Sequence, residues 1–293
     1  MSSSTVPALL VEAFASAPLQ GNGAAVVLLE QPASAAWMQA LAGSLQQSET
    51  AFLHADAGGQ WRLRWFTPSC EVPLCGHATL AATLALQHWG QLRPGEQLTL
   101  ASRSGGLQVG LISGGASLVL PSGGVEPLAP PAALEALLGA PLLGYWGSAL
   151  GYRVALMDPA FPLAELPLPS SQLEEADRAG LVVMQALDPA TAPQLLGGGC
   201  DYQLRFFAPG LGIDEDPVTG SAHALVAPWW MQQLQKNSVR GWQASSRRGG
   251  MLCEDTAPGF VRLTGTGQLL WDGHINAAGS GCDPQGWLVC SAA

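Results

Sequence analysis

Short apolar runs recur along the whole chain, bounded by glycine, proline and polar residues, and they predict a fold rich in short β-strands. Peripheral helices are expected at residues 35–46, 132–138 and 172–179. The strands are expected at residues 8–14, 24–29, 51–54, 62–66, 98–101, 107–111, 118–120, 153–156, 181–185, 203–207, 260–264 and 268–271.

Two further segments are apolar on nearly every side of a helix, so we expect both helices to be buried all round. The first covers residues 76–89 and is followed by Gly90 as a C-terminal stop. The second covers about 220–236, where Pro228 is expected to kink the helix or to split off its last turns. We predict that each helix forms the centre of one half of the protein and is wrapped by a curved sheet.

An internal repeat accompanies these two helices. Residues 63–68 read LRWFTP and residues 204–209 read LRFFAP, and each copy is followed by acidic residues, a proline and a Gly-rich helix start. The chain therefore looks duplicated, and its 293 residues fit two domains. We predict one domain at 1–122, with the tail 283–293 as a candidate addition to it, and the other at 123–282. The Pro- and Gly-rich residues 121–131 are the expected linker.

Composition and charge exclude several classes of protein. Hydrophobic residues make up 48% of the chain and charged residues 12%, which is typical of a folded protein. The net charge of −10, with twelve Lys and Arg in total, offers no basic stripe for nucleic acid. No signal peptide is recognised, and glycines interrupt the charge-free residues 136–152, so no membrane helix is expected. We expect a soluble, cytoplasmic protein, and the sequence leaves open whether it is a homodimer.

Metals and organic cofactors are not indicated either. The six cysteines are scattered and are expected to be reduced and mostly buried, and the five histidines show no zinc-binding spacing. The single lysine, Lys236, lies in a polar stretch and is unsuited to a Schiff base. Nucleotide-binding glycine motifs are absent from the sequence. We therefore expect no metal and no cofactor.

The starts of the two apolar helices are candidate anion sites. A helix N-terminus has unpaired N–H groups and a favourable dipole, and small residues let a ligand approach them closely. Aligning the repeats on Gly76 and Gly220 puts His77 opposite Ser221. If the halves pack about a pseudo-twofold axis, both starts can face one cleft between the domains. The expected ligand is a small anionic metabolite.

A carboxylate near these helix starts is a candidate general base. Glu49 enters an apolar strand, and burial is expected to raise its pKa toward neutrality. A second acidic cluster, residues 214–216, precedes Gly220. The alternatives stay open at this point, because Glu49 can simply cap local backbone and an acidic triplet is usually a solvated loop.

Six short motifs occur along the chain: EAF at 12–14, SETAF at 48–52, RWFTP at 64–68, LCGHAT at 74–79, RFFAP at 205–209 and GIDEDPVTGSAH at 212–223. In these motifs the chain resembles the PhzF-like family, which is named for phenazine biosynthesis. The resemblance implies an α/β (α+β) fold like that of diaminopimelate epimerase. In that fold, two pseudo-symmetric domains each wrap a barrel-like, mostly antiparallel or mixed sheet around a central helix.

The same resemblance implies a cofactor-independent isomerase. Glu49 matches the general acid/base of the family, and His77 and Asp216 match polar groups that contact the substrate. Ser221, with the backbone of Gly76 and Gly220, matches the site that holds the substrate carboxylate. In the phenazine enzyme, this arrangement moves a proton along a dihydro-hydroxyanthranilate ring. The chain departs from the family pattern at Gly23, at Pro73 and at the pair 46–47. These departures are expected to affect which substrate is accepted.

Three rival functions remain. An amino-acid epimerase with two opposed thiols would use Cys75, whose pKa a helix N-terminus lowers, but the second helix start offers no cysteine. A serine hydrolase on Ser221 lacks the nucleophile-elbow motif. A non-catalytic protein that binds a small molecule or another protein would keep the fold without turnover, and the presence of Glu49, His77 and Asp216 argues against it.

Overall fold

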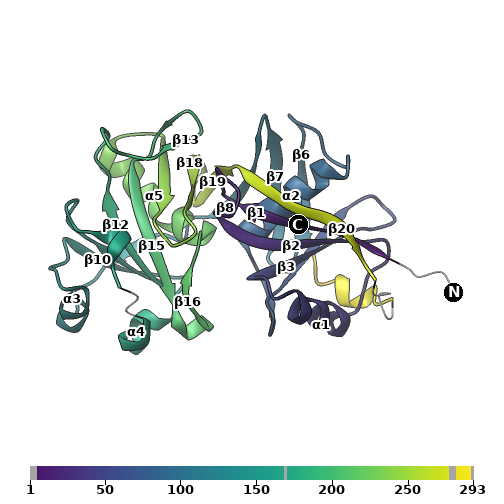
Figure 1. The fold of residues 1–293 in the computed structure, drawn as a ribbon, viewed down its shortest axis with the longest axis horizontal. Helices are drawn as coiled ribbons and strands as arrows, with labels where there is room; N and C mark the ends of the chain where they lie inside the picture. The colour runs from purple at the N-terminus through teal and green to yellow at the C-terminus, as the bar shows by residue number, and fades with distance from the viewer. Residues whose placement is uncertain (1–4, 168–169, 277–281, 292–293) are drawn as a thin grey trace. The chain divides into compact units, whose positions relative to one another are not determined.

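A computed structural model describes residues 5–167, 170–276 and 282–291 (Figure 1). The chain forms two compact units, Met1–Val119 with Gly265–Ala293 and Leu120–Thr264. We call them the first and the second unit. From the sequence, the tail 283–293 is the candidate addition to the first domain. In the structure, the chain re-enters the first unit earlier, at Gly265. The reason is that β20 (Gly267–Ile275) pairs antiparallel along the whole of β1 (Val6–Ala13).

The first unit is a mixed, mostly antiparallel sheet around one buried helix. Its elements are β1 (Val6–Ala13), β2 (Asn22–Leu29), α1 (Ala35–Leu45), β3 (Glu49–Ala55), β4 (Trp61–Phe66), β5 (Glu71–Val72), α2 (Gly76–His88), β6 (Gln97–Ser102), β7 (Gly105–Ile112), β8 (Gly115–Pro121), β20 (Gly267–Ile275) and the short η4 (Gln285–Trp287). The order of pairing is β20-β1-β2-β3-β4-β6-β7-β8. Only the β2–β3 and β4–β6 pairs in this series are parallel.

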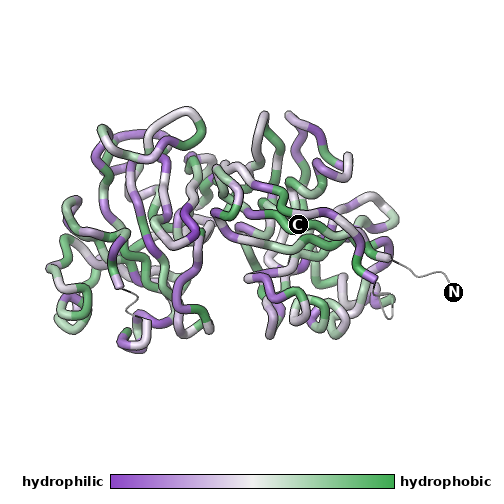
Figure 2. The backbone as a smooth tube through the Cα atoms, viewed as in Figure 1, coloured by the Kyte–Doolittle hydropathy of each residue, from purple (hydrophilic) through white to green (hydrophobic). Residues whose placement is uncertain are grey.

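The helix α2 forms the core of the first unit, as its composition predicts. Nine of its thirteen residues are buried, and it packs against β1, β2, β3 and β7. The strands around it are mainly apolar, as the green tube in Figure 2 shows. Burial on all sides fixes the direction of the helix and therefore the position of its first turn at Gly76 and His77.

The second unit repeats this design. Its elements are β9 (Val125–Pro127), α3 (Ala132–Leu138), β10 (Gly144–Ser148), β11 (Arg153–Leu156), η1 (Leu163–Glu165), η2 (Ser170–Gln172), α4 (Glu175–Arg178), β12 (Leu181–Ala186), β13 (Gln194–Leu195), β14 (Gly198–Gly199), β15 (Tyr202–Ala208), η3 (Pro209–Leu211), β16 (Ile213–Asp216), α5 (Gly220–Leu234), β17 (Ser238–Gln243), β18 (Gly249–Ala257) and β19 (Phe260–Gly265). The strands pair in the order β9-β10-β11-β12-β15-β17-β18-β19. The β11–β12 and β15–β17 pairs are parallel, and they stand at the same places in the order as β2–β3 and β4–β6 in the first unit. The duplication predicted from the motifs therefore extends to the whole sheet.

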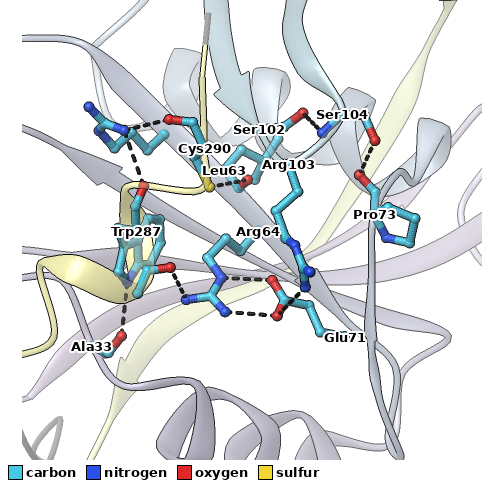
Figure 3. A network of polar contacts seen from close by, with 12 residues as sticks. Ala33, Leu63, Arg64, Glu71, Pro73, Ser102, Arg103, Ser104, Trp287 and Cys290 are labelled. Carbon is cyan, nitrogen blue, oxygen red and sulfur yellow. Dashed lines mark hydrogen bonds and ion pairs between the residues drawn. The ribbon is translucent and has the colours of Figure 1, made fainter.

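The repeated arginines have the same contacts in both units. Arg64 forms a bidentate ion pair with Glu71, at 2.7 and 2.8 Å, and Arg205 forms one with Glu215, at 2.6 and 2.8 Å. Each guanidinium also lies over the ring of the phenylalanine two residues later. Figure 3 shows how Arg64 reaches Glu71, which is also contacted by Arg103. These pairs tie the strand carrying the arginine to the short strand, β5 or β16, that precedes the central helix.

Some local expectations differ from the structure. The helix α5 continues through Pro228, so the proline does not split off its last turns. The helix expected at 172–179 is only the short α4, because the preceding residues form the 3-10 helix η2. The expected linker at 121–131 contains β9, which pairs with β10 and belongs to the second unit. The cysteines are free and four of the six are buried, as expected. Among the described residues, we find no helix with the length and apolar character needed to span a membrane.

Candidate active site

Glu49 and His77 meet in the first unit, where a strand begins beside the start of the central helix. Glu49 is the first residue of β3, and His77 is the second residue of α2. Glu49 Oε2 lies 3.0 Å from His77 Nε2, and the two side chains are 18% and 7% exposed. The pair is therefore largely shielded from water but is reachable on the carboxylate side.

The other ring nitrogen of His77 faces the first residue of β2. Asn22 Nδ2 lies 3.2 Å from His77 Nδ1, and the Ser48 hydroxyl donates a hydrogen bond to Asn22 Oδ1 at 3.2 Å. Cys75 Sγ lies 3.5 Å from the same ring nitrogen. The imidazole is thus contacted on both edges by polar groups that come from three different elements.

Glu49 and His77 each stabilise the charged form of the other. Burial is the largest single influence and raises the pKa of Glu49, but the charge of His77 and the polar contacts with His77 and Cys75 together outweigh it, so the pKa lies below its ordinary value. Burial opposes a charge on His77, yet Cys75 and Glu49 together hold the pKa of His77 well above its ordinary value. The expected net rise in the pKa of Glu49 is therefore wrong, because the sequence does not reveal the imidazole beside it.

One oxygen of Glu49 remains available for a further proton. The contact of Glu49 Oε2 with His77 has the distance of an ion pair but not the direction of a hydrogen bond. Oε2 is therefore a buried carboxylate oxygen without a hydrogen-bond partner among the described residues. Buried polar atoms are normally satisfied, and an exception of this kind is typical of a site that awaits a ligand.

Cys75 is buried beside this pair and caps α2 without a side-chain hydrogen bond to the helix. Burial, with the negative charge of Glu49 in second place, raises the pKa of the Cys75 thiol to about 11. The expectation that the helix N-terminus lowers this pKa is wrong, because burial and the carboxylate outweigh the helix dipole. Cys75 is a neutral thiol at physiological pH.

In the second unit, the start of α5 carries its own polar group. Thr219 is the N-cap, and its hydroxyl donates to Asp216 Oδ2 at 2.5 Å. Gln243 accepts from the Thr219 N–H at 2.8 Å and donates to the Asp216 carbonyl at 2.6 Å. Asp216 is only 9% exposed, so this network fixes the orientation of a nearly buried carboxylate.

Ser221 lies one residue beyond Gly220 in the first turn of α5, and its hydroxyl is 3.3 Å from the Tyr152 hydroxyl. The N-cap Thr219 makes no side-chain hydrogen bond to the helix, as is also true of Cys75 in the first unit. First-turn N–H groups that no side chain caps are suited to binding an anion. Gly220, Ser221 and Tyr152 therefore form a polar surface at this helix start.

The structure brings the predicted residues together in two groups. Glu49, Gly76 and His77 lie together in the first unit, and Asp216, Gly220 and Ser221 lie together in the second. That both groups form one site stays a prediction.

Three polar side chains of these groups were not assigned a role from the sequence. These are Asn22, Tyr152 and Gln243, and none carries a local signal because each is distant in sequence from its partner His77, Ser221 or Thr219.

Sulfur, nitrogen and oxygen atoms of Cys75, His77 and Glu49 lie within 4.8 Å of one another and have the chemistry of a three-ligand metal set. The spacing of the sequence could not show this set, because its members come from a strand and a helix start. The same atoms also complement each other without a metal, since Glu49 neutralises His77 and the Cys75 thiol retains its proton.

Comparison with known proteins gives the family. A family model described as phenazine biosynthesis-like protein matches residues 11–119 and 167–273. The chain belongs to this family. An uncharacterized isomerase of Pseudomonas aeruginosa is 38% identical over 265 residues, which cover 90% of this chain and 96% of that protein.

Solved structures agree with this membership. A PhzF-family phenazine biosynthesis protein of Enterococcus faecalis has a TM-score of 0.81 at 31% identity and covers 93% of this chain and 99% of that one. A hydroxyproline epimerase from Agrobacterium vitis, solved with bound trans-4-hydroxy-L-proline, has a TM-score of 0.56 at 13% identity over 96% of this chain and 94% of that one, and shows a shared fold alone. The predicted two-domain, epimerase-like α/β fold is therefore confirmed.

Proposed function

We propose that this protein is a cofactor-independent isomerase that moves a proton on a small metabolite bearing a carboxylate, with Glu49 as the general acid/base. The observation that carries the proposal is the Glu49 carboxylate beside His77, with one buried oxygen that lacks a hydrogen-bond partner among the described residues. Membership of a family with a relative named as an isomerase supports the reaction class.

The lowered pKa of Glu49 keeps it ionised at neutral pH, so it is ready to accept a proton. Its Oε2 takes a proton from a C–H bond next to an electron-withdrawing group of the substrate, and the bonding electrons shift into the conjugated system. The Glu49 carboxylic acid then returns the proton to another carbon of the same system. Atoms and charge balance without an external oxidant or reductant.

In this proposal, His77 stabilises the carboxylate before the transfer and contacts the polar group on which negative charge develops. Asp216, oriented by Thr219 and Gln243, contacts a polar substituent of the substrate. The N–H groups at the starts of α2 and α5, at Gly76 and Gly220, bind the substrate carboxylate with the Ser221 hydroxyl.

An epimerase with two thiols is a less suitable assignment. Cys75 is the N-cap of α2, and the corresponding N-cap of α5 is Thr219, which cannot act as a thiolate. The raised pKa of Cys75 also opposes its use as a base at neutral pH. A single neutral thiol does not supply the opposed acid and base that such a reaction requires.

The experiment begins with a panel of small carboxylate metabolites, ranked by how much each raises the melting temperature of the purified protein. Compounds that bind are then incubated with the protein in D₂O, and deuterium incorporation at carbon is followed by NMR. We expect incorporation with the wild-type protein and a loss on the order of 10²-fold or more with Glu49→Gln, because an amide cannot accept the proton.

Glu30→Gln is the matched control, since Glu30 is an exposed glutamate just beyond the end of β2. It removes the same charge and is expected to leave the exchange rate unchanged. Binding of a carboxylate without any deuterium exchange would favour a non-catalytic binding protein. Exchange at the wild-type rate in Glu49→Gln would remove Glu49 from the mechanism.

A further inference from the structure

Asn22 occupies a position from which it can control the imidazole of His77. It is fully buried, with 0% exposure, at the first position of β2. Its amide lies between two polar groups, with Nδ2 at 3.2 Å from His77 Nδ1 and Oδ1 at 3.2 Å from the Ser48 hydroxyl. A buried amide in such a place restricts which hydrogens its neighbours can carry.

The donor and acceptor roles follow from the chemistry of the groups. In the structure, Asn22 Oδ1 accepts from the Ser48 hydroxyl and the amide NH₂ faces His77. An NH₂ group only donates, and His77 Nδ1 must therefore accept and carry no hydrogen. The hydrogen of the neutral ring is then on Nε2, which is the nitrogen 3.0 Å from Glu49 Oε2.

The charged ring requires a different arrangement. An imidazolium carries hydrogen on both nitrogens, so its Nδ1–H would meet the NH₂ group of Asn22. A half-turn of the amide presents Oδ1 to Nδ1–H and lets Nδ2 donate to the Ser48 hydroxyl, which can accept as well as donate. Cys75 Sγ, 3.5 Å from Nδ1, is a weaker alternative acceptor.

We infer that Asn22 is a positioning residue, which holds His77 with Nε2 toward Glu49 and sets the nitrogen that carries the proton of the neutral ring. The inference rests on the proposed function, because it concerns how the imidazole beside the acid/base candidate is held. Asn22 acts through His77 and is not itself assigned a contact with the substrate.

Other titratable groups on the strands around α2 have partners elsewhere or, like His274, are exposed. Glu12 on β1 accepts from the Leu19 N–H at 2.6 Å, and His54 on β3 contacts the Leu29 carbonyl. Asp272 on β20 pairs with His88, at the opposite end of α2. His274 lies near the end of β20, and the described strands β2 and β7 carry no titratable side chain. Glu49 and Cys75 are thus the titratable groups in contact with His77.

The test measures the proton on His77 directly by ¹⁵N NMR of the imidazole, which needs no substrate. In the wild-type protein, titrated to the neutral ring, we expect the hydrogen on Nε2. Asn22→Asp presents only acceptor atoms, so the hydrogen should move to Nδ1 and the titration of His77 should shift to higher pH. Asn22→Leu keeps the branched shape but removes both polar groups and should give a mixture of tautomers.

Activity gives the second readout. With a substrate found by deuterium exchange, Asn22→Leu should lower kcat about tenfold or more and change KM much less, and Asn22→Asp should displace the pH profile. Thr83→Val is the control, because it removes a buried hydrogen bond on the same helix, at 2.8 Å to the Thr79 carbonyl. It should lower the melting temperature without changing the His77 tautomer.

Hydrogen on Nδ1 of the neutral ring in the wild-type protein overturns the inference, and this measurement needs no variant to fold. An unchanged tautomer in a folded Asn22→Asp protein overturns it as well. If the tautomer responds but no carboxylate metabolite ever exchanges deuterium, the proposed function fails while the control of His77 by Asn22 stands.

Discussion

Glu49 of the first unit and Gly180 of the second occupy equivalent positions in the duplicated sheet. The repeat aligns Phe66 with Phe207, and these residues pair with Thr50 and Leu181, which directly follow Glu49 and Gly180. The acid/base candidate is therefore present in one copy of the repeat only. The second copy contributes a different set of polar groups, Asp216, Ser221 and Tyr152, to its own helix start.

Gly180 cannot gain a side chain without displacing its neighbours. A Cβ at this position would lie 2.5 Å from the ring of Tyr152 and 2.9 Å from the ring of Phe206. We expect Gly180→Ala to lower the free energy of unfolding by about 1–3 kcal/mol, measured by denaturant titration. Gly273→Ala is the control, because nothing lies within 4 Å of its Cβ. Equal stability of the two variants would contradict the crowding at Gly180.

The ion pair of Glu49 and His77 predicts a pH window of added stability. The lowered pKa of Glu49 gives stability that is present above 4.5, its ordinary value, and is lost as the pH falls through the folded-state pKa. The raised pKa of His77 gives stability that is complete below 6.5 and is lost as the pH rises through the folded-state pKa. The stability difference between wild type and Glu49→Gln should therefore be largest between pH 4.5 and 6.5.

The quantity to measure is the difference in stability between wild type and Glu49→Gln, because the wild type alone does not isolate the ion pair. Burial lowers the pKa of His223 to about 3, so the stability of both proteins falls as the pH drops below 6.5. Calorimetric or denaturant measurements at several pH values separate the two effects, since the His223 contribution cancels. A difference that does not vary with pH would show that Glu49 and His77 are not coupled.

The thiol of Cys75 is predicted to be unreactive and dispensable. At pH 8, iodoacetamide should modify the exposed Cys70 much faster than Cys75, because the pKa of Cys75 is about 11 and the residue is buried. Mass spectrometry of the peptides measures both rates. Cys75→Ser should keep the deuterium exchange within about tenfold of wild type. Complete loss of exchange in a folded Cys75→Ser protein would support a thiol as the proton carrier.

An anion should bind at the start of α5. Sulfate or phosphate is expected within hydrogen-bonding distance of Gly220 and Ser221 in crystals. Ser221→Asp adds a fixed negative charge and should weaken binding of a carboxylate ligand by about tenfold or more, measured by calorimetry. Ser171→Asp, at an exposed serine of the same unit, should leave the affinity unchanged. Equal affinities in the two variants would remove Ser221 from the binding site.

The sequence determined the duplication, the two buried central helices and the motif residues at their starts. These features follow from local patterns, since an apolar helix with small residues must be buried and a repeated motif must fold alike in both copies. The boundary at Gly265 depended on the pairing of β20 with β1, which are distant in sequence. Strand pairing over such a distance leaves no local pattern.

Only the tertiary structure decided the electrostatics of the candidate site. Glu49, Cys75 and His77 come from β3 and the start of α2, and their packing reversed the expected directions of the pKa of Glu49 and of Cys75. A pKa depends on burial and on charges within a few ångströms, whichever part of the chain supplies them. The role of Asn22 has the same origin, because its contact with His77 spans 55 positions of the sequence.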